Sequence, residues 1–286
     1  MLGTRRIGHA GTLDPMATGL LVLAVERSTK LLGQLVLTDK SYRATIRLGA
    51  ATTTDDAEGE RVSAGDASVI DDDAIADGIR ALTGGLRQVP SAVSAIKVDG
   101  RRSYERVRAG EQVELAARSV TISRFELLGP VRRSGSFIDL DVVVDCSTGT
   151  YIRALARDLG AALHVGGHLT ALRRTRVGPF ELTAAVDIYG PDGVPERGAP
   201  RPNITDELRA RVAAALIPAA GAARTAFRIR SATETESIEL SFGRSLPAVG
   251  IPGTYAVLDP SGTRLLALVT EIDGLARPRL VFEAAG

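Results

Sequence analysis

The sequence is poor in residues that form disulfides or bind metals. It contains one cysteine, Cys146, which excludes an internal disulfide and leaves no thiolate cluster for zinc or for an iron–sulfur centre. We expect Cys146 to be a small buried residue on a strand. Two of the three histidines, His164 and His168, flank Gly166 and Gly167, which weaken any helix that would align both rings. The sequence therefore predicts no metal site.

Long apolar segments are also absent. The longest apolar run has six residues, whereas a membrane-spanning helix needs about 20, and residues 1–6 lack the apolar centre of a signal peptide. The 286 residues are 44% apolar and 24% charged, which is typical of a globular protein. This length suits one large domain and one small one. We expect a cytoplasmic protein that does not contact a membrane.

Charge is balanced overall but distributed unevenly along the chain. The net charge is only +1, yet residues 51–77 hold nine acidic side chains and one arginine, and residues 87–108 hold six basic side chains and two acidic ones. Arg173, Arg174 and Arg176 form another basic cluster. Such separation gives a neutral protein a positive face, for which a polyanion is the natural partner. A solvated helix face is the alternative explanation of the same basic run.

Hydrophobic periodicity predicts strands and helices in the first two thirds of the chain. Residues 41–48 alternate, with Tyr42, Ala44, Ile46 and Leu48 on one face, which is typical of a half-buried strand. Residues 119–127 and 137–146 predict two strands of a long hairpin. Residues 71–82 and 151–163 predict helices, the second preceded by Thr148-Gly149-Thr150 as a turn and cap.

The remaining third predicts a linker and a small β-rich domain. Proline and glycine are dense in residues 190–202, and residues 206–215 predict a short helix. Residues 255–258 and 264–269 predict a hairpin, to which residues 279–282 add a strand. We therefore expect an α+β fold with three parts: a domain of residues 1–186 with a mixed, mostly antiparallel sheet and flanking helices, a linker of residues 187–224, and a small domain of residues 225–286.

One short carboxylate stands out near the start of the chain. Asp14 lies among Gly8, Gly11 and Gly19 and directly before Pro15, a composition that holds a side chain in a tight turn. Asp followed by Pro is also the usual start of a helix. The apolar run at residues 20–25 has no helical period, however, and reads as a buried strand. Asp14 then lies in a loop that enters a sheet, where functional groups tend to be carried.

Six strings of residues, in order over residues 5–176, resemble a known family. They are Gly-His-Ala-Gly-Thr-Leu-Asp-Pro (8–15) with Ala-Thr-Gly (17–19), Lys-Ser-Tyr-Arg (40–43), Asp-Asp-Ala-Glu-Gly (55–59), Pro-Ser-Ala-Val-Ser-Ala-Ile-Lys (90–97), Cys-Ser-Thr-Gly-Thr-Tyr-Ile-Arg (146–153) and His-Leu-Thr-Ala-Leu-Arg-Arg (168–174). The chain resembles the TruB family of pseudouridine synthases, which convert uridine 55 in the T-loop of tRNA to pseudouridine.

The resemblance implies a role for each matching residue. Asp14 corresponds to the catalytic aspartate, Arg153 to the arginine that pairs with it, and Tyr42 to the tyrosine that stacks on the target base and is a proposed base in proton removal. Three further residues bind substrate by the same resemblance: His9 orders the flipped-out nucleotides, and Tyr151 and Leu172 line the uracil pocket. Arg173 belongs to the last string and is expected to contact substrate as well.

The reaction explains why these residue types suffice. It breaks an N-glycosidic bond, turns the uracil ring and forms a C–C bond, without net redox change, so no cofactor is expected. A carboxylate serves as nucleophile or proton acceptor, and an arginine beside it keeps it ionised in a dry pocket. Attack of Asp14 on the base, attack on the sugar and a route through proton removal at the sugar all remain open.

The resemblance also implies an RNA grip. Lys97, Arg101 and Arg102 lie in an insertion of about residues 87–113, together with Arg106, Arg108 and Tyr104, and would meet the phosphates of tRNA. The domain of residues 225–286 corresponds to the family's PUA-like RNA-binding module. We expect a monomer whose partner is the T-loop and elbow of tRNA.

One departure from the family pattern concerns the start of the chain. Family members carry a Lys-Pro-x-Gly segment and a first strand ahead of the arginines that correspond to Arg5 and Arg6, and Met1 stands where that segment has already ended. Either the reading frame continues upstream or the chain is truncated, which would expose a sheet edge. The alternatives to a tRNA pseudouridine synthase are an RNA-binding protein without chemistry and a related synthase that acts on another RNA.

Overall fold

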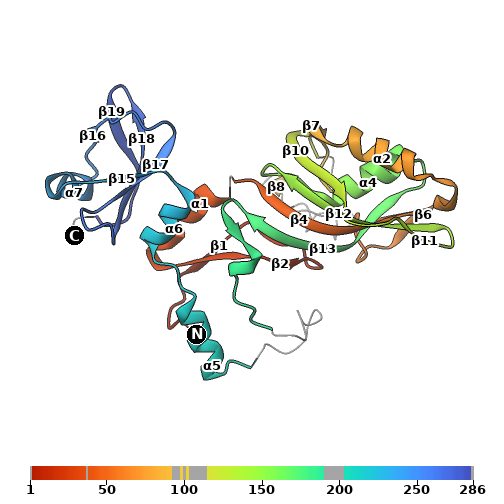
Figure 1. Cartoon of the computed structure of the whole chain (residues 1–286), viewed down its shortest axis with the longest axis horizontal. Helices are drawn as coiled ribbons and strands as arrows, with labels where there is room; N and C mark the ends of the chain where they lie inside the picture. Colours follow the sequence, from red (N-terminus) through yellow and green to blue (C-terminus); the bar gives the residue numbers. More distant parts are fainter. Residues whose placement is uncertain are drawn as a thin grey trace. The chain divides into compact units, whose positions relative to one another are not determined.

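The computed structural model describes residues 2–36, 38–91, 97–98, 101–102, 115–189 and 203–284 (Figure 1). The chain folds into two compact units that interleave along the sequence. One, here called the sheet unit, comprises Leu13–Leu20 and Leu37–Val177, and the other, the composite unit, comprises Met1–Thr12, Leu21–Val36 and Gly178–Gly286. Both contain helices and strands, so the predicted α+β class is confirmed.

An antiparallel sheet forms the centre of the sheet unit. Its strands run in the order β13 (Gly167–Val177), β4 (Lys40–Leu48), β12 (Phe137–Cys146), β10 (Arg118–Leu127) and β7 (Gly84–Gln88). The short strand β2 (Thr18–Gly19) runs parallel to β13, and β11 (Arg132–Ser134) pairs with β12. The sheet is therefore mixed and mostly antiparallel, as the sequence predicts.

Two helices pack on one face of this sheet and bury the main core. They are α2 (Asp72–Ala81), capped by the carboxylate of Asp71, and α4 (Ile152–Ala162). The predicted face of β4, with Tyr42, Ala44, Ile46 and Leu48, lies in this core. Gly160 of α4 meets Gly167 of β13 so closely that a Cβ atom on Gly160 would lie 2.1 Å from the Gly167 nitrogen. The two glycines thus let α4 lie directly on β13.

Shorter elements complete the sheet unit. β5 (Ala50–Thr52) and β6 (Arg61–Ala64) form a hairpin, followed by a 3₁₀ turn at Ala67–Val69. The backbones of β8 (Lys97–Val98) and β9 (Arg101–Arg102) form another two-stranded ladder.

The composite unit is built on a five-stranded sheet. Its order is β15 (Ile229–Ser231), β17 (Thr254–Leu258), β18 (Leu265–Ile272), β19 (Leu275–Val281) and β16 (Leu246–Pro247). The predicted hairpin and third strand correspond to β17, β18 and β19. The unit also contains β1 (Ile7–Ala10), β3 (Val22–Val25), β14 (Phe180–Glu181), α1 (Leu32–Leu35), α5 (Asp206–Ala214), α6 (Ala219–Ala226), α7 (Glu234–Ser241), and 3₁₀ turns at Glu26–Leu31 and Leu182–Ala184. The predicted helix 206–215 is confirmed by α5, and the predicted linker 190–202 lies outside the described residues.

Two local predictions are wrong, and one long strand was missed. The apolar run 20–25 gives only the four-residue strand β3, which pairs with β1 and leaves Leu23 59% exposed, so it is not a buried strand. The 148–150 turn does not cap α4, because Tyr151 is the N-cap residue and the Thr150 hydroxyl donates to the Ser147 carbonyl. The long strand β13 was not predicted at all, since two register shifts break its alternation.

Candidate active site

Asp14 lies in a loop that leads into β2, as expected, and does not start a helix. The Ala17 amide donates to the Asp14 carbonyl over 2.9 Å, which closes a turn around Pro15. The far end of the loop is fixed to β13 by two hydrogen bonds: the Leu20 amide donates to the Arg174 carbonyl, and Arg174 Nε donates to the Leu20 carbonyl, each over 2.8 Å. These hydrogen bonds fix the loop that carries Asp14 to the sheet unit.

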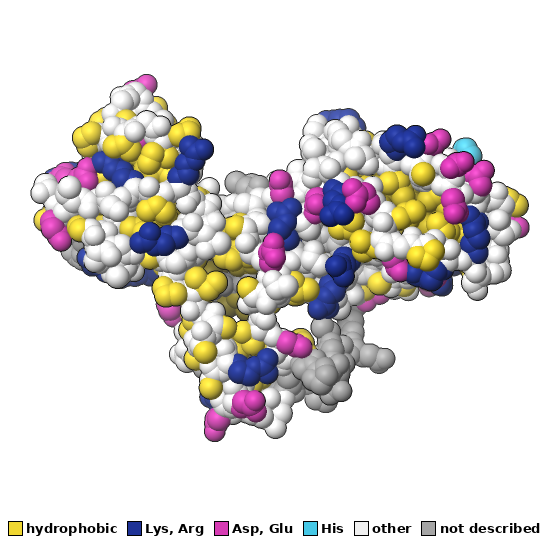
Figure 2. Space-filling model, viewed as in Figure 1, with side chains coloured by type: hydrophobic (Ala, Val, Ile, Leu, Met, Phe, Trp, Pro, Cys, Tyr) yellow, Lys and Arg dark blue, Asp and Glu magenta, His cyan; other side chains and the backbone are white. Residues whose placement is uncertain are grey.

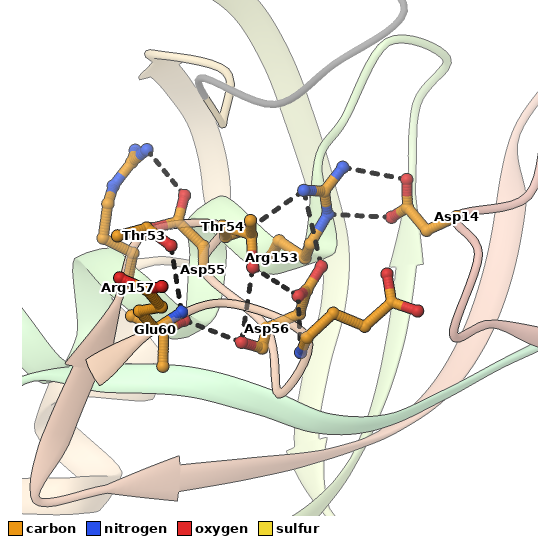
Figure 3. Close-up of polar contacts among 10 residues, drawn as sticks. Asp14, Thr53, Thr54, Asp55, Asp56, Glu60, Arg153 and Arg157 are labelled. Atoms are coloured by element: carbon orange, nitrogen blue, oxygen red, sulfur yellow. Dashed lines mark hydrogen bonds and ion pairs between the residues drawn. The ribbon is translucent and has the colours of Figure 1, made fainter. Parts of the chain in front are cut away.

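The side chain of Arg153 binds the Asp14 carboxylate through two parallel hydrogen bonds (Figure 3). Nε lies 2.9 Å from Asp14 Oδ2, and Nη2 lies 2.8 Å from Oδ1. The Arg153 side chain is only 4% exposed, whereas the Asp14 side chain is 31% exposed. A buried guanidinium therefore orients a carboxylate that remains open to a substrate.

The third nitrogen of Arg153 is also engaged. Nη1 donates to the Thr54 carbonyl over 2.9 Å and lies 3.5 Å from Asp56 Oδ2. Asp56 is itself fixed, because its other oxygen accepts the Thr54 hydroxyl at 2.5 Å and the Glu58 amide at 3.0 Å (Figure 3). This buried second carboxylate offsets the charge of Arg153 and prevents the guanidinium from turning.

An adjacent ion pair strengthens the same loop. Arg157 lies one turn further along α4. Its Nη1 is 3.3 Å from Asp55 Oδ2, and its Nη2 donates to the Val89 carbonyl. Burial raises the pKa of Asp55, and the nearby Arg157 opposes that shift. The Asp-Asp-Ala-Glu-Gly string therefore supplies two carboxylates to two arginines of one helix. No role for Asp55 or Asp56 was predicted, because their partners are about 100 positions away in the chain.

Tyr42 projects from β4 into the core near this site. It is 8% exposed, and burial raises its pKa to about 12, with the charge of Asp14 acting in the same direction and Arg174 opposing. The phenol is therefore neutral near pH 7. A general base must be deprotonated to act, so the environment of Tyr42 favours stacking and hydrogen bonding over proton abstraction.

The other predicted site residues are placed as follows. Tyr151 precedes α4, exchanges two hydrogen bonds with the Gln88 side chain and lies under the Arg118 guanidinium, 5.3 Å from the ring centre. Leu172 is buried on the Tyr42 face of the sheet, opposite Ala44. Arg173 points to the other face.

Several predicted substrate contacts lie in the composite unit or outside the described side chains. His9 lies in β1 of the composite unit, paired with Leu23. Lys97, Arg101 and Arg102 lie in the β8–β9 ladder, of which the backbone alone is described, and Tyr104 lies outside the described residues. Cys146 is buried at the end of β12 as expected, and burial raises its pKa to about 11.

Comparison with family models covers most of the chain. Residues 1–152 match the model described as TruB family pseudouridylate synthase (N terminal domain). The chain belongs to the TruB family. Residues 153–189 and 227–283 of this TruB chain match the models for a tRNA pseudouridylate synthase B C-terminal domain and for tRNA pseudouridine synthase II, C terminal. Among the described residues, every helix is too short or too polar to cross a bilayer.

Curated relatives agree with this membership, and a solved structure shares the fold. The TruB chain is 56% identical to tRNA pseudouridine synthase B of Rhodococcus jostii, over 95% of this chain and 83% of that protein. It is also 56% identical to the protein of the same name from Nocardia farcinica, over 100% of this chain and 87% of that one. The structure titled "Crystal Structure of a Cbf5-Nop10-Gar1 Complex" shares the fold, with a TM-score of 0.65 and 24% identity over 99% of this chain and 78% of that chain.

Proposed function

We propose that this chain isomerises uridine 55 in the T-loop of tRNA to pseudouridine, with Asp14 as the catalytic carboxylate. The observation that carries the proposal is the bidentate Arg153–Asp14 pair, in which the buried member is the arginine and the accessible member is the carboxylate. An arginine cannot lose its proton in a protein. Arg153 therefore holds the Asp14 carboxylate in one orientation, open to a substrate.

The arrangement suits a reaction that needs one rigid carboxylate and no cofactor. Asp14 has two oxygens, and each accepts one hydrogen bond from Arg153. Because a carboxylate oxygen can accept more than one bond, a lone pair remains for attack on the base or the sugar, or for a proton of the sugar. Arg153 is fixed by Thr54 and Asp56, so the carboxylate is oriented before the substrate arrives.

The target base must leave its stack before Asp14 reaches it. Unstacking costs a few kcal/mol, which stacking on an aromatic ring offsets. We assign this stacking to Tyr42 as a neutral phenol and the side of the uracil pocket to Leu172 and Tyr151. His9 would order the displaced nucleotides.

The proposal extends to the RNA grip and the setting of the enzyme. Lys97, Arg101 and Arg102, in the insertion of about residues 87–113, would bind phosphates of the tRNA elbow. Residues 1–186 would carry catalysis and residues 225–286, as a PUA-like module, would add RNA contacts after a linker of residues 187–224. We propose a monomer that works in the cytoplasm.

The variant Asp14→Asn tests the function directly. It removes the negative charge and changes the side chain by one atom, so we expect no pseudouridine while the dissociation constant for tRNA changes less than about threefold. Asp77→Asn, on the exposed side of α2, is the matched control and should retain full turnover. Substantial turnover by Asp14→Asn would falsify the assignment.

The choice of RNA separates the remaining alternatives. Wild-type protein is incubated with a T-loop hairpin and with ribosomal RNA fragments, and pseudouridine is detected by chemical labelling followed by mass spectrometry. Product on the hairpin alone supports a tRNA enzyme. Binding without product in either RNA would indicate an RNA-binding protein, and product only in the ribosomal fragments would indicate a different substrate.

A further inference from the structure

The face of the sheet opposite the main core carries a series of complementary charge pairs. Arg47 binds Asp139 through two hydrogen bonds of 2.7 Å, and Arg132 binds both oxygens of Asp141. Arg176 Nη2 lies 3.8 Å from Asp145 Oδ1. On the face that Figure 2 shows, basic and acidic side chains likewise lie side by side over the sheet unit. The three acids lie on one face of β12, at positions 139, 141 and 145, and each of them pairs with an arginine of another strand.

One row of this face breaks the pattern. Arg43 of β4 lies directly opposite Arg173 of β13, and its neighbour on β12 is Val143, where the series would place an acid. Both arginines are exposed, and neither has a carboxylate partner among the described residues. Like charges directly opposite on antiparallel strands destabilise a sheet. The row is therefore an uncompensated positive site of two guanidinium groups.

The surroundings of the row strengthen its positive character. Arg173 Nη1 donates to the Thr18 hydroxyl over 3.2 Å, which holds this side chain beside β2. Glu126, the residue of β10 beyond Val143, is already engaged by Arg124 through two hydrogen bonds. Val143 is only 9% exposed and contributes no charge. An anion at this row would thus meet two guanidinium groups and no unpaired carboxylate from these strands.

We propose that Arg43 and Arg173 together bind a backbone phosphate of RNA. Guanidinium groups offer paired N–H donors that match phosphate oxygens, and a phosphate between them would remove their mutual repulsion. The residues point away from the face that carries Tyr42, so the phosphate belongs to a segment other than the target nucleotide. The inference rests on the proposed function only for the identity of the RNA as tRNA.

Binding of a tRNA transcript at several salt concentrations tests this site. In the variant Arg43→Ala/Arg173→Ala, we expect affinity about ten- to hundredfold weaker than wild type, and a salt dependence whose slope is smaller by about one. The matched control is Arg80→Ala/Arg133→Ala, which removes the same charge from two arginines paired with Asp77 and Asp72. The control should change the affinity by less than about threefold. Affinities and slopes that are equal in the two double variants would overturn the proposal.

A second variant keeps both arginines and supplies the missing acid. Val143→Asp places a carboxylate next to Arg43, and we expect it to weaken tRNA binding while Val143→Asn does not. Thermal unfolding of both variants shows whether the sheet remains intact. If Val143→Asp and Val143→Asn bind tRNA equally, the site is not electrostatic and the proposal fails.

Pseudouridine formation by the wild type on the same transcript is measured separately. A wild type that binds tRNA but forms no product contradicts the proposed function, while the binding comparison still decides the role of Arg43 and Arg173.

Discussion

Arg153 and Asp14 are 139 positions apart in the chain, yet two parallel hydrogen bonds of 2.9 and 2.8 Å join their side chains. Lysine keeps the charge but cannot form this planar, two-pronged contact. We therefore expect Arg153→Lys to lower kcat by about 100-fold or more, a loss of roughly 3 kcal/mol of transition-state stabilisation. Single-turnover kinetics on a tRNA transcript measure this loss. A kcat within about threefold of wild type would mean that charge alone, and not orientation, is what Arg153 supplies.

The second carboxylate at Arg153 yields a separate prediction. Asp56→Asn preserves the acceptor for the Glu58 amide but removes the charge 3.5 Å from Arg153 Nη1. We expect kcat and kcat/KM to fall together by about tenfold, since the loss affects the orientation of Asp14 and not the binding of RNA. Asp77→Asn, with a side chain that is 70% exposed, serves as the control. A change confined to KM would show that Asp56 contacts the substrate instead.

A pair of glycines tests how the loop of Asp14 is held. Gly19 has φ +95° and a Cβ atom there would lie 2.2 Å from the Arg174 carbonyl oxygen, whereas Gly84 has φ +99° and nothing within 4 Å. Alanine is strained at both positions, but only Gly19→Ala also pushes β2 away from β13. We expect Gly19→Ala to be about 2 kcal/mol less stable than Gly84→Ala, and to lose most activity. Urea unfolding and turnover of the two variants provide the comparison, and equal values would contradict the close contact.

Hydrophobic periodicity predicted the helices and strands that bury a single apolar face. β4 and α4 each show one apolar face to the core, so apolar residues alternate along β4 and recur every three or four positions along α4. β13 lies between β4 and β2 and contains the buried Arg174, and its pairing with β4 shifts near residues 170 and 175. An alternation rule fails on such a strand. The interleaving of the two units was equally invisible, because it depends on contacts between residues far apart in the chain.

The site was predictable only in part for a related reason. Local composition singled out Asp14, but the roles of Asp14, Tyr42 and Arg153 followed from a family resemblance, and the structure brings Asp14 and Arg153 into contact. Asp56 stands in a quoted string, yet nothing in one sequence links it to an arginine of a distant helix. Paired variation of positions 56 and 153 across many sequences is the signal that would have indicated this contact.

The protonation of Tyr42 leads to a prediction about pH. Burial raises its pKa from 10.0 to about 12, so the folded state favours the neutral phenol. The contribution of Tyr42 to the free energy of unfolding is fully present below pH 10 and is lost as the pH rises through 12. Between these values the unfolded chain releases a proton that the folded chain retains. At pH 11 the free energy of unfolding should have fallen by about 1 kcal/mol from this residue alone.

Tyr42→Phe isolates that contribution. It keeps the ring but removes the titrating hydroxyl, so its stability should decline less between pH 9 and pH 11 than that of the wild type, by the same amount of about 1 kcal/mol. Tyr255, whose pKa is also raised by burial, contributes equally to both proteins and cancels in the comparison. Urea unfolding at the two pH values measures the difference. Parallel declines in the two proteins would mean that Tyr42 ionises near its ordinary pKa, so that burial adds nothing to its preference for the neutral phenol.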